Sequence, residues 1–178
     1  SEIEAAADAI GRAAVLVCQL EIPLALNLAA LRHARAAGVR TIFNPAPAKA
    51  ELPPEAYQLS DVFCPNEHEA ALLAGMPVTT PAQAAAAGQA FLARGARAAV
   101  ITLGARGSMV VTADGVEHVS AQRVQAIDST GAGDAFVGSL AYLLGIGLEL
   151  NDAVRRAGAI ATRSVLTPGT QTSFPTRT

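Results

Sequence analysis

The sequence of 178 residues has one lysine, two cysteines and no apolar run long enough to cross a membrane. A Walker-type phosphate site needs a lysine between glycine and serine or threonine, and Lys49 lies between two alanines, so this kind of nucleotide site is excluded. The start of the chain shows no basic segment followed by an apolar one. We therefore expect neither membrane insertion nor secretion, and a cytoplasmic protein.

Charge and metal-binding side chains are also scarce. Charged residues make up 16% of the chain, and a net charge of -2 argues against a nucleic-acid-binding surface. Cys18 and Cys64 fall in segments that we expect to be buried strands, where two reduced thiols are favoured over a disulfide. His33, His68 and His118 are too scattered to indicate a metal cluster.

The apolar segments alternate between strand and helix patterns. Strands are predicted at residues 15–20, 39–43, 62–64 and 98–103, and helices at 3–13, 23–37, 67–74, 81–94, 131–144 and 150–164. Such alternation predicts parallel strands joined by helical crossovers, a Rossmann-like α/β fold. Residues 108–112 and 116–119 flank Ala113-Asp114-Gly115, which predicts an antiparallel hairpin. With no repeat, linker or second core, we expect one domain over residues 1–178.

Polar residues follow the predicted parallel strands where ligands collect in open α/β sheets. They are Glu21, Asn44, Asn66, Glu69, Thr102, Gly104 and Gly107. Asn66 and Glu69 have the spacing of a capping box, which closes a helix start without a ligand. The segment 102–108 fits an ordinary turn between strands, with Arg106 in solvent, and it lacks the glycine fingerprint of a dinucleotide site.

The segment Asp128-Ser129-Thr130-Gly131-Ala132-Gly133-Asp134 leads into an apolar run with helical spacing. The free amides of a helix start attract anions, and its glycines let a phosphate approach the backbone. Asp134 would lie beside that phosphate, where a carboxylate has a use as general base for an attacking hydroxyl. In the alternative, Thr130 caps the helix and Asp134 only complements the helix dipole.

Several motifs together resemble the PfkB family of carbohydrate kinases, and within it the ribokinases. They are residues 43–48 (FNPAPA), 60–69 (SDVFCPNEHE), 128–134 (DSTGAGD) and 169–175 (GTQTSFP). The likeness runs from about Ala14 to Pro175 in consistent order and covers the later part of a ribokinase. It implies a ribokinase-type three-layer α/β/α fold and MgATP-dependent phosphorylation of a sugar hydroxyl. The first candidate for the acceptor is the 5-hydroxyl of D-ribose.

The resemblance also implies roles for individual residues. Asp134 would be the base and sugar contact, in an anion hole formed by Gly131, Ala132 and Gly133. Asn66 and Glu69 would organise Mg²⁺ and phosphate, often through water, and the segment with Thr102, Gly104 and Gly107 would contact ATP. A K⁺ site behind the anion hole would involve Asp128, Thr130, Ser164, Thr167, Gly169 and Ser173.

The sequence departs from the family pattern in two respects. The early Gly-Gly motif, the aspartate that grips the sugar and the small sheet that forms lid and dimer contact are missing, so Glu21 alone remains of the sugar ligands. Gly158 stands where many relatives carry histidine or asparagine near the adenine. Another PfkB kinase, acting on a nucleoside or a different sugar, and a non-catalytic nucleotide-binding fragment stay open as alternatives, while a dinucleotide oxidoreductase is disfavoured. A homodimer is expected for a full-length parent.

Overall fold

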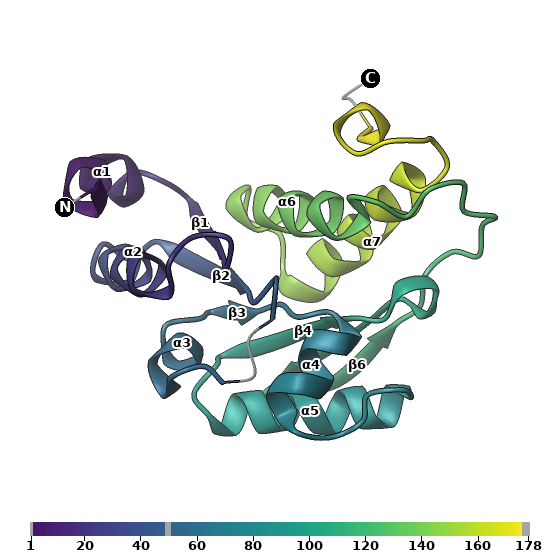
Figure 1. Cartoon of the computed structure of the whole chain (residues 1–178), viewed down its shortest axis with the longest axis horizontal. Coiled ribbons are helices and arrows are strands. Elements are labelled where there is room, and N and C mark those ends of the chain that lie inside the picture. Colours follow the sequence, from purple (N-terminus) through teal and green to yellow (C-terminus); the bar gives the residue numbers. More distant parts are fainter. Residues whose placement is uncertain (1, 49–50, 176–178) are drawn as a thin grey trace.

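The computed structural model describes residues 2–48 and 51–175, so that Lys49 lies outside the described residues. A six-stranded sheet carries helices on both faces (Figure 1), and its strands occur in the same order as in the chain. They are β1 (Val15–Gln19), β2 (Arg40–Asn44), β3 (Val62–Phe63), β4 (Ala98–Thr102), β5 (Ser108–Thr112) and β6 (Gly115–Val119). β1 to β4 are parallel and β4 to β6 antiparallel, which confirms the predicted mixed sheet.

The helices follow the predicted segments closely, with one addition. They are α1 (Glu2–Gly11), α2 (Leu24–Ala36), α3 (Pro54–Gln58), α4 (Glu67–Ala74), α5 (Pro81–Ala93), α6 (Ala132–Gly145) and α7 (Leu150–Ser164), with short 3₁₀ turns at Gly104–Arg106 and Gln171–Ser173. The sequence pattern did not predict α3. No helix in the described residues is both long and apolar enough to cross a membrane.

The hairpin between β5 and β6 differs from the prediction by one residue. Thr112 pairs with Gly115, so the turn consists of Ala113 and Asp114, and β6 begins at the glycine that was expected in the turn. A two-residue connection is the commonest way to join antiparallel neighbours, because its twist matches that of the strands.

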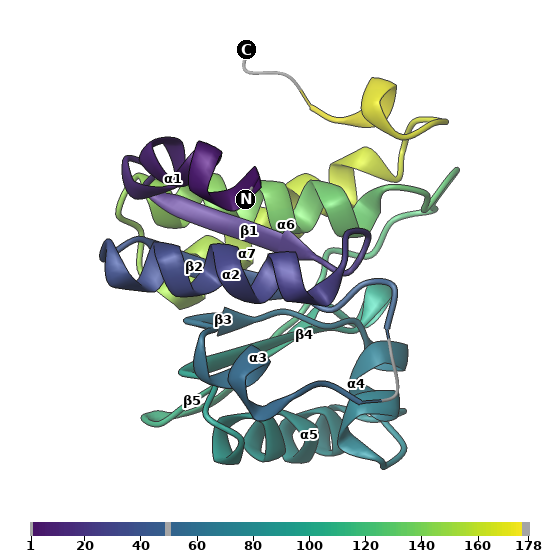
Figure 2. The ribbon, with the colours of Figure 1, turned by 60° about the vertical axis from the view of Figure 1, so that its left-hand side comes forward.

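The inner strands of the sheet contribute to two hydrophobic cores, because successive side chains of a strand point to opposite faces. The expectation of no second core is therefore wrong, although the two cores share one sheet. Phe43 and Phe63 belong to the core covered by α1 to α5, whereas their neighbours Ile42 and Val62 belong to the core covered by α6 and α7. Figure 1 shows α6 and α7 on one side of the sheet and α3, α4 and α5 on the other. Figure 2 shows β1 at the edge of the sheet, beside α2 and α6.

The first core explains why α3 forms. Its Tyr57 lies with the ring centroid 4.8 Å from that of Phe63, which in turn lies 5.0 Å from that of Phe91. All three side chains are almost completely buried, and full burial of a side chain of this kind stabilises by about 1.5–3 kcal/mol. Tertiary packing, which a local pattern does not encode, therefore holds this five-residue helix.

The two cysteines lie in different cores. Cys18 packs with the α1 to α5 core and Cys64 with the α6 and α7 core, and both are buried and free. Burial raises the pKa of the Cys18 thiol to about 11 and that of Cys64 to about 12. Both side chains therefore act as small core residues rather than reactive thiols.

The register of the parallel strands brings their carboxyl ends to one edge of the sheet. Gln19 at the end of β1 pairs with Asn44 at the end of β2, and Asn66, after β3, bridges to Thr102 of β4. We call this the carboxyl-terminal edge. It holds the polar residues that the sequence places after each parallel strand.

Candidate functional site

The start of α6 lies toward the carboxyl-terminal edge. The last turn of this helix is at the opposite edge, because the carbonyl of Leu144 accepts a hydrogen bond from Arg40 at the beginning of β2. Gly131 is the N-cap residue, with a φ of 78° that glycine adopts without strain. No side chain of the described residues caps α6, so the alternative that Thr130 caps it is wrong.

The first turn of α6 combines backbone amides with a carboxylate. The amide of Ala132 donates to the carbonyl of Ser129 at 3.2 Å, so one of the three predicted anion-hole amides has an internal partner. A Cβ built on Gly133 would meet no atom within 4 Å, so the space beside this residue is open. Asp134 is exposed in the same turn. This arrangement provides a helix start that attracts an anion, with an acidic side chain next to it.

The loop near the carboxyl end of the chain packs against Gly131. A Cβ on this glycine would lie 3.3 Å from both the Phe174 ring and the Cβ of Thr170. The buried Ser173 holds the loop in shape, since its hydroxyl donates to the carbonyl of Thr170 at 2.6 Å. The tail is therefore part of the site and not a free chain end.

Asp128 joins the two loops. One carboxylate oxygen accepts the amide of Thr130 at 2.9 Å, and the other accepts the amide of Gly169 at 2.9 Å. Hydrogen bonds from the Thr130 hydroxyl, the Gly169 amide and the Thr130 amide lower the pKa of Asp128 to about 2. The structure thus brings together three of the residues predicted to form a cation site.

Ser164 and Thr167, which also belong to the predicted cation site, form hydrogen bonds with residues three positions away in the chain. The hydroxyl of Ser164 is buried and donates to the carbonyl of Ala161 at 2.9 Å, while the amide of Thr167 donates to the carbonyl of Ser164 at 3.4 Å. Among the described residues, no group of three or more His, Cys, Asp and Glu side chains could hold a metal ion. Any cation here would depend on carbonyl oxygens and a single carboxylate.

The start of α4 forms the capping box that the sequence allows. Asn66 Oδ1 accepts the amides of His68 and Glu69, both at 2.9 Å, and Glu69 Oε2 accepts the amide of Asn66 at 2.8 Å. Glu69 is buried, and loss of solvent raises the pKa of its carboxyl. These bonds explain the motif without a ligand, and a role with magnesium stays a prediction.

The segment after β4 lies against the start of α4. Thr102 donates its amide to the carbonyl of Pro65 at 3.0 Å, and the backbone then forms the 3₁₀ turn Gly104–Arg106. The side chain of Arg106 binds the carboxylate of Glu67 and the carbonyl of Thr79, so the expectation that it only points into solvent is wrong.

The ends of β1 and β2 are linked by amide side chains. Asn44 accepts a hydrogen bond from Gln19 Nε2 at 2.7 Å and donates to the carbonyl of Cys64 at 2.6 Å, so it joins three strands structurally. Glu21, the predicted sugar contact, is exposed in the turn that follows β1. Sequence reasoning missed Asn27 of α2, which fixes that turn by donating to the carbonyl of Gln19 at 2.7 Å.

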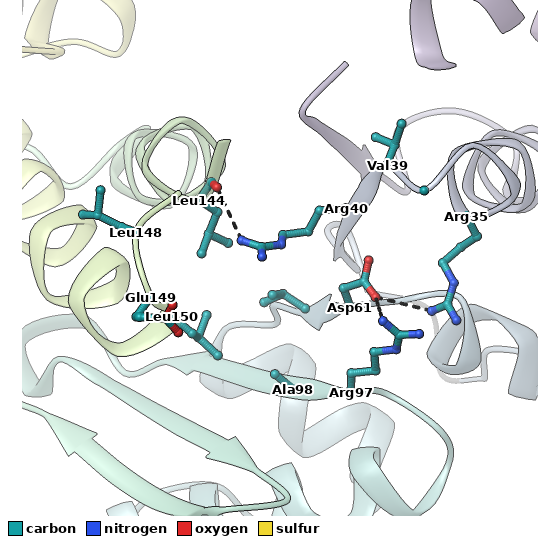
Figure 3. Close-up of a pocket in the computed structure, with 12 residues that line it drawn as sticks. Arg35, Val39, Arg40, Asp61, Arg97, Ala98, Leu144, Leu148, Glu149 and Leu150 are labelled. Atoms are coloured by element: carbon teal, nitrogen blue, oxygen red, sulfur yellow. Dashed lines mark hydrogen bonds and ion pairs between the residues drawn. The ribbon is translucent and has the colours of Figure 1, made fainter. Parts of the chain in front are cut away.

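Two cavities lie at opposite edges of the sheet. A cavity of about 350 Å³ between β6 and α7 is lined by Gly107, a predicted ATP contact, and by Gly158, which stands where many relatives carry histidine or asparagine. A larger one, of about 450 Å³, opens at the amino ends of β2, β3 and β4 (Figure 3), where Arg35 and Arg97 both pair with Asp61. In the larger cavity two arginines thus share one carboxylate, and Arg40 donates to the carbonyl of Leu144 at 3.4 Å.

Known proteins resemble this chain in both sequence and structure. Residues 3–177 match the family model described as pfkB family carbohydrate kinase. The ribokinase of Mus musculus is 47% identical over 98% of this chain and 55% of its own length, and the deoxyribokinase of Salmonella typhi is 36% identical over 98% and 57%. The structure of Arabidopsis thaliana ribokinase complexed with ribose and ATP matches with a TM-score of 0.90 at 27% identity, over 97% of this chain and 56% of that chain.

These matches agree with the architecture described above. The chain spans about half the length of the curated relatives. The match over almost the whole of this chain confirms the ribokinase-type α/β/α arrangement, with the sheet between two helical layers. Because the family model covers nearly every residue, from the first helix to the carboxyl-terminal loop, this chain belongs to the PfkB family of carbohydrate kinases.

Proposed function

We propose that this chain supplies the nucleotide-binding part and the catalytic aspartate of a kinase that transfers the γ-phosphoryl group of ATP to a sugar hydroxyl. The observation that carries the proposal is the start of α6, where a left-handed Gly131 opens the first turn beside the exposed carboxylate of Asp134. Relatives named ribokinase and deoxyribokinase support a pentose acceptor, and we take the 5-hydroxyl of D-ribose as the first candidate.

In this proposal the α6 start performs the chemistry. Asp134 accepts the proton of the sugar hydroxyl as the hydroxyl oxygen attacks the γ-phosphorus. The bond from the γ-phosphorus to the bridging oxygen of the β-phosphate breaks, which releases ADP. The amides of Gly131, Ala132 and Gly133 hold the transferring phosphoryl oxygens, helped by the positive end of the helix dipole. For Ala132 this requires exchange of its 3.2 Å bond to Ser129 for a bond to the phosphate.

ATP would lie along the carboxyl-terminal edge. Thr102, Gly104 and Gly107 would contact its ribose and phosphates, and the 350 Å³ cavity lined by Gly107 and Gly158 would take the adenine. A glycine at position 158 contributes no side chain to the base, so shape rather than a hydrogen bond from that residue would hold it.

The residues also fit the two proposed cations. Glu69, whose carboxylate accepts the Asn66 amide, would help to hold Mg²⁺ through water, as this ion prefers. When bound, the magnesium would neutralise the phosphate charges. The low pKa of Asp128 keeps this residue anionic, which suits a K⁺ ion bound with the carbonyls of the carboxyl-terminal loop.

The proposed acceptor depends on one predicted sugar contact and on the acceptors that relatives are named for. Glu21 is the predicted sugar contact in this chain, and the aminoimidazole riboside kinase of Salmonella enterica, with a TM-score of 0.79 at 27% identity, favours a nucleoside as the second candidate. We expect the isolated 178-residue chain to bind MgATP weakly and to phosphorylate ribose poorly or not at all, because acceptor positioning and water exclusion supply much of the rate.

The test is the substitution Asp134→Asn in a full-length kinase that contains this segment. Turnover should fall by about two to four orders of magnitude, because the amide cannot accept the proton, while ATP affinity should hold or improve. Asp152→Asn is the matched control, since Asp152 also lies in the first turn of a helix and is exposed. Near-normal turnover in the Asp134 variant, equal to the control, would show that the base is elsewhere.

A further inference from the structure

Arg106 connects two segments that are distant in the sequence and adjacent at the carboxyl-terminal edge. Its guanidinium binds the Glu67 carboxylate in the first turn of α4 and the Thr79 carbonyl before α5. Its own carbonyl accepts a hydrogen bond from the imidazole of His118 on β6 at 2.8 Å. One residue of the 3₁₀ turn is therefore attached to three other parts of the chain.

Backbone bonds close this turn on itself, since Arg106 donates to Leu103 and Gly107 to Gly104, and backbone groups at its two ends contact neighbouring segments. Thr102 is held at one end by the Pro65 carbonyl, and Gly107 at the other end touches β6 so closely that a Cβ would lie 2.0 Å from the carbonyl oxygen of Val119. Gly104 and Ala105 between them are exposed. Among the hydrogen bonds of the described residues, the Arg106 guanidinium makes the link between this turn and α4.

The link also changes the charge at the start of α4. Glu67 stabilises the amino end of the helix dipole, but an unpaired carboxylate would repel the phosphates of a nucleotide bound nearby. Pairing with Arg106 neutralises it, while the neighbouring Asn66 and Glu69 are engaged in the capping box. A planar guanidinium suits this place because it donates to two acceptors on different segments, which one ammonium does less well.

We propose that Arg106 is a positioning residue that holds the Gly104–Arg106 turn against α4 and so sets the distance between the nucleotide-contacting loop and the Asn66–Glu69 motif. The ligand that needs this spacing is a magnesium-bound nucleoside triphosphate. The inference rests on the proposed function for its ligand, whereas the mechanical link between the two segments stands on the contacts themselves.

The experiment uses the 178-residue chain with Arg106→Met, Glu67→Gln, the double variant and Arg106→Lys. MgATP affinity is measured by calorimetry, and amide hydrogen exchange is followed in residues 66–69 and 103–107. Each of the first two substitutions should weaken MgATP binding by about three- to tenfold, because the loop conformation that binds MgATP becomes a minor state. The double variant should lose no more MgATP affinity than the weaker-binding of the two single variants. Arg106→Lys should lose less MgATP affinity than Arg106→Met.

A matched control separates positioning from general stability. Arg32→Met breaks a more exposed ion pair, with Glu55, between α2 and α3, and should leave MgATP affinity and exchange at both segments unchanged. The thermal midpoint should fall in both the Arg32 and the Arg106 variants, whereas MgATP affinity should fall in the Arg106 variant alone.

The outcomes distinguish the two proposals. Additive losses in the double variant, or unchanged affinity with unchanged exchange in Arg106→Met, would overturn the positioning role. If the unsubstituted chain binds no MgATP, the proposed function fails for this chain. Amide hydrogen exchange alone then tests whether Arg106 links the two segments. Faster exchange at both segments in Arg106→Met would then uphold the link, and unchanged rates would reject it.

Discussion

Replacing Gly107 by alanine tests the packing of the nucleotide-contacting loop. The new Cβ would lie 2.0 Å from the carbonyl oxygen of Val119, 2.7 Å from the amide nitrogen of Ala121 and 2.9 Å from the carbonyl carbon of Ser120. All three are backbone atoms, so no side chain can rotate away. The residue also has φ 92° and ψ -132°, a conformation almost confined to glycine.

The magnitude follows from the two effects. The backbone conformation should cost about 1–3 kcal/mol and the overpacking about another 1–3 kcal/mol of the free energy of unfolding. With a urea m-value of about 2 kcal/mol/M, the midpoint of unfolding should fall by roughly 1–3 M. The same displacement should weaken MgATP binding, because the loop has to move away from β6.

Gly104→Ala is the control within the same turn. Gly104 also has a positive φ, of 57°, but a Cβ there meets no atom within 4 Å. It should therefore cost only about 1 kcal/mol, the price of a left-handed conformation for alanine. Equal losses in the two variants would refute the argument that contact with β6 fixes the loop.

Two further predictions concern Asp128. Since its pKa is lowered from 3.8 to about 2 in the folded chain, the stability that it contributes is present above about pH 4 and is lost as the pH falls toward 2; urea unfolding at several acidic pH values should show this loss, and Asp128→Asn should abolish its share of it. If the carboxyl-terminal loop binds K⁺, the thermal midpoint should be higher in KCl than in NaCl at equal ionic strength, and Asp128→Ala should remove the difference. Identical midpoints in the two salts would reject the cation site.

The fold could be predicted largely because its elements have strong local signals. In α7, Ala153, Val154 and Ala157 recur at helical spacing and are all buried, and the predicted and observed bounds agree. The helix α3 has only five residues and depends on Tyr57 in a distant aromatic cluster, so its sequence carries no comparable period. The hairpin was misplaced by one residue because Gly115 is a turn former that here begins a strand.

The site was predictable to the level of its motifs and no further. The spacing of Asn66 and Glu69 predicted the capping box, and the glycines around position 131 predicted an open helix start. The pairing of Arg106 with Glu67 joins residues 39 positions apart, and no local pattern specifies it. The bridge between Asn66, after β3, and Thr102 of β4, together with the bond from the Thr102 amide to Pro65, brings the two segments together.

The division of the sheet between two cores also has a consequence for synthesis of the chain. The last strand ends at Val119, but the helices that cover Ile42, Val62 and Val100 begin only at Ala132 and end at Ser164. At about 5–20 residues per second, a ribosome needs roughly 2–9 s to make the intervening residues. During that time the nascent sheet has one covered face and one exposed apolar face, so chaperones should bind ribosome-attached chains that stop before α6 more strongly than chains that include α7.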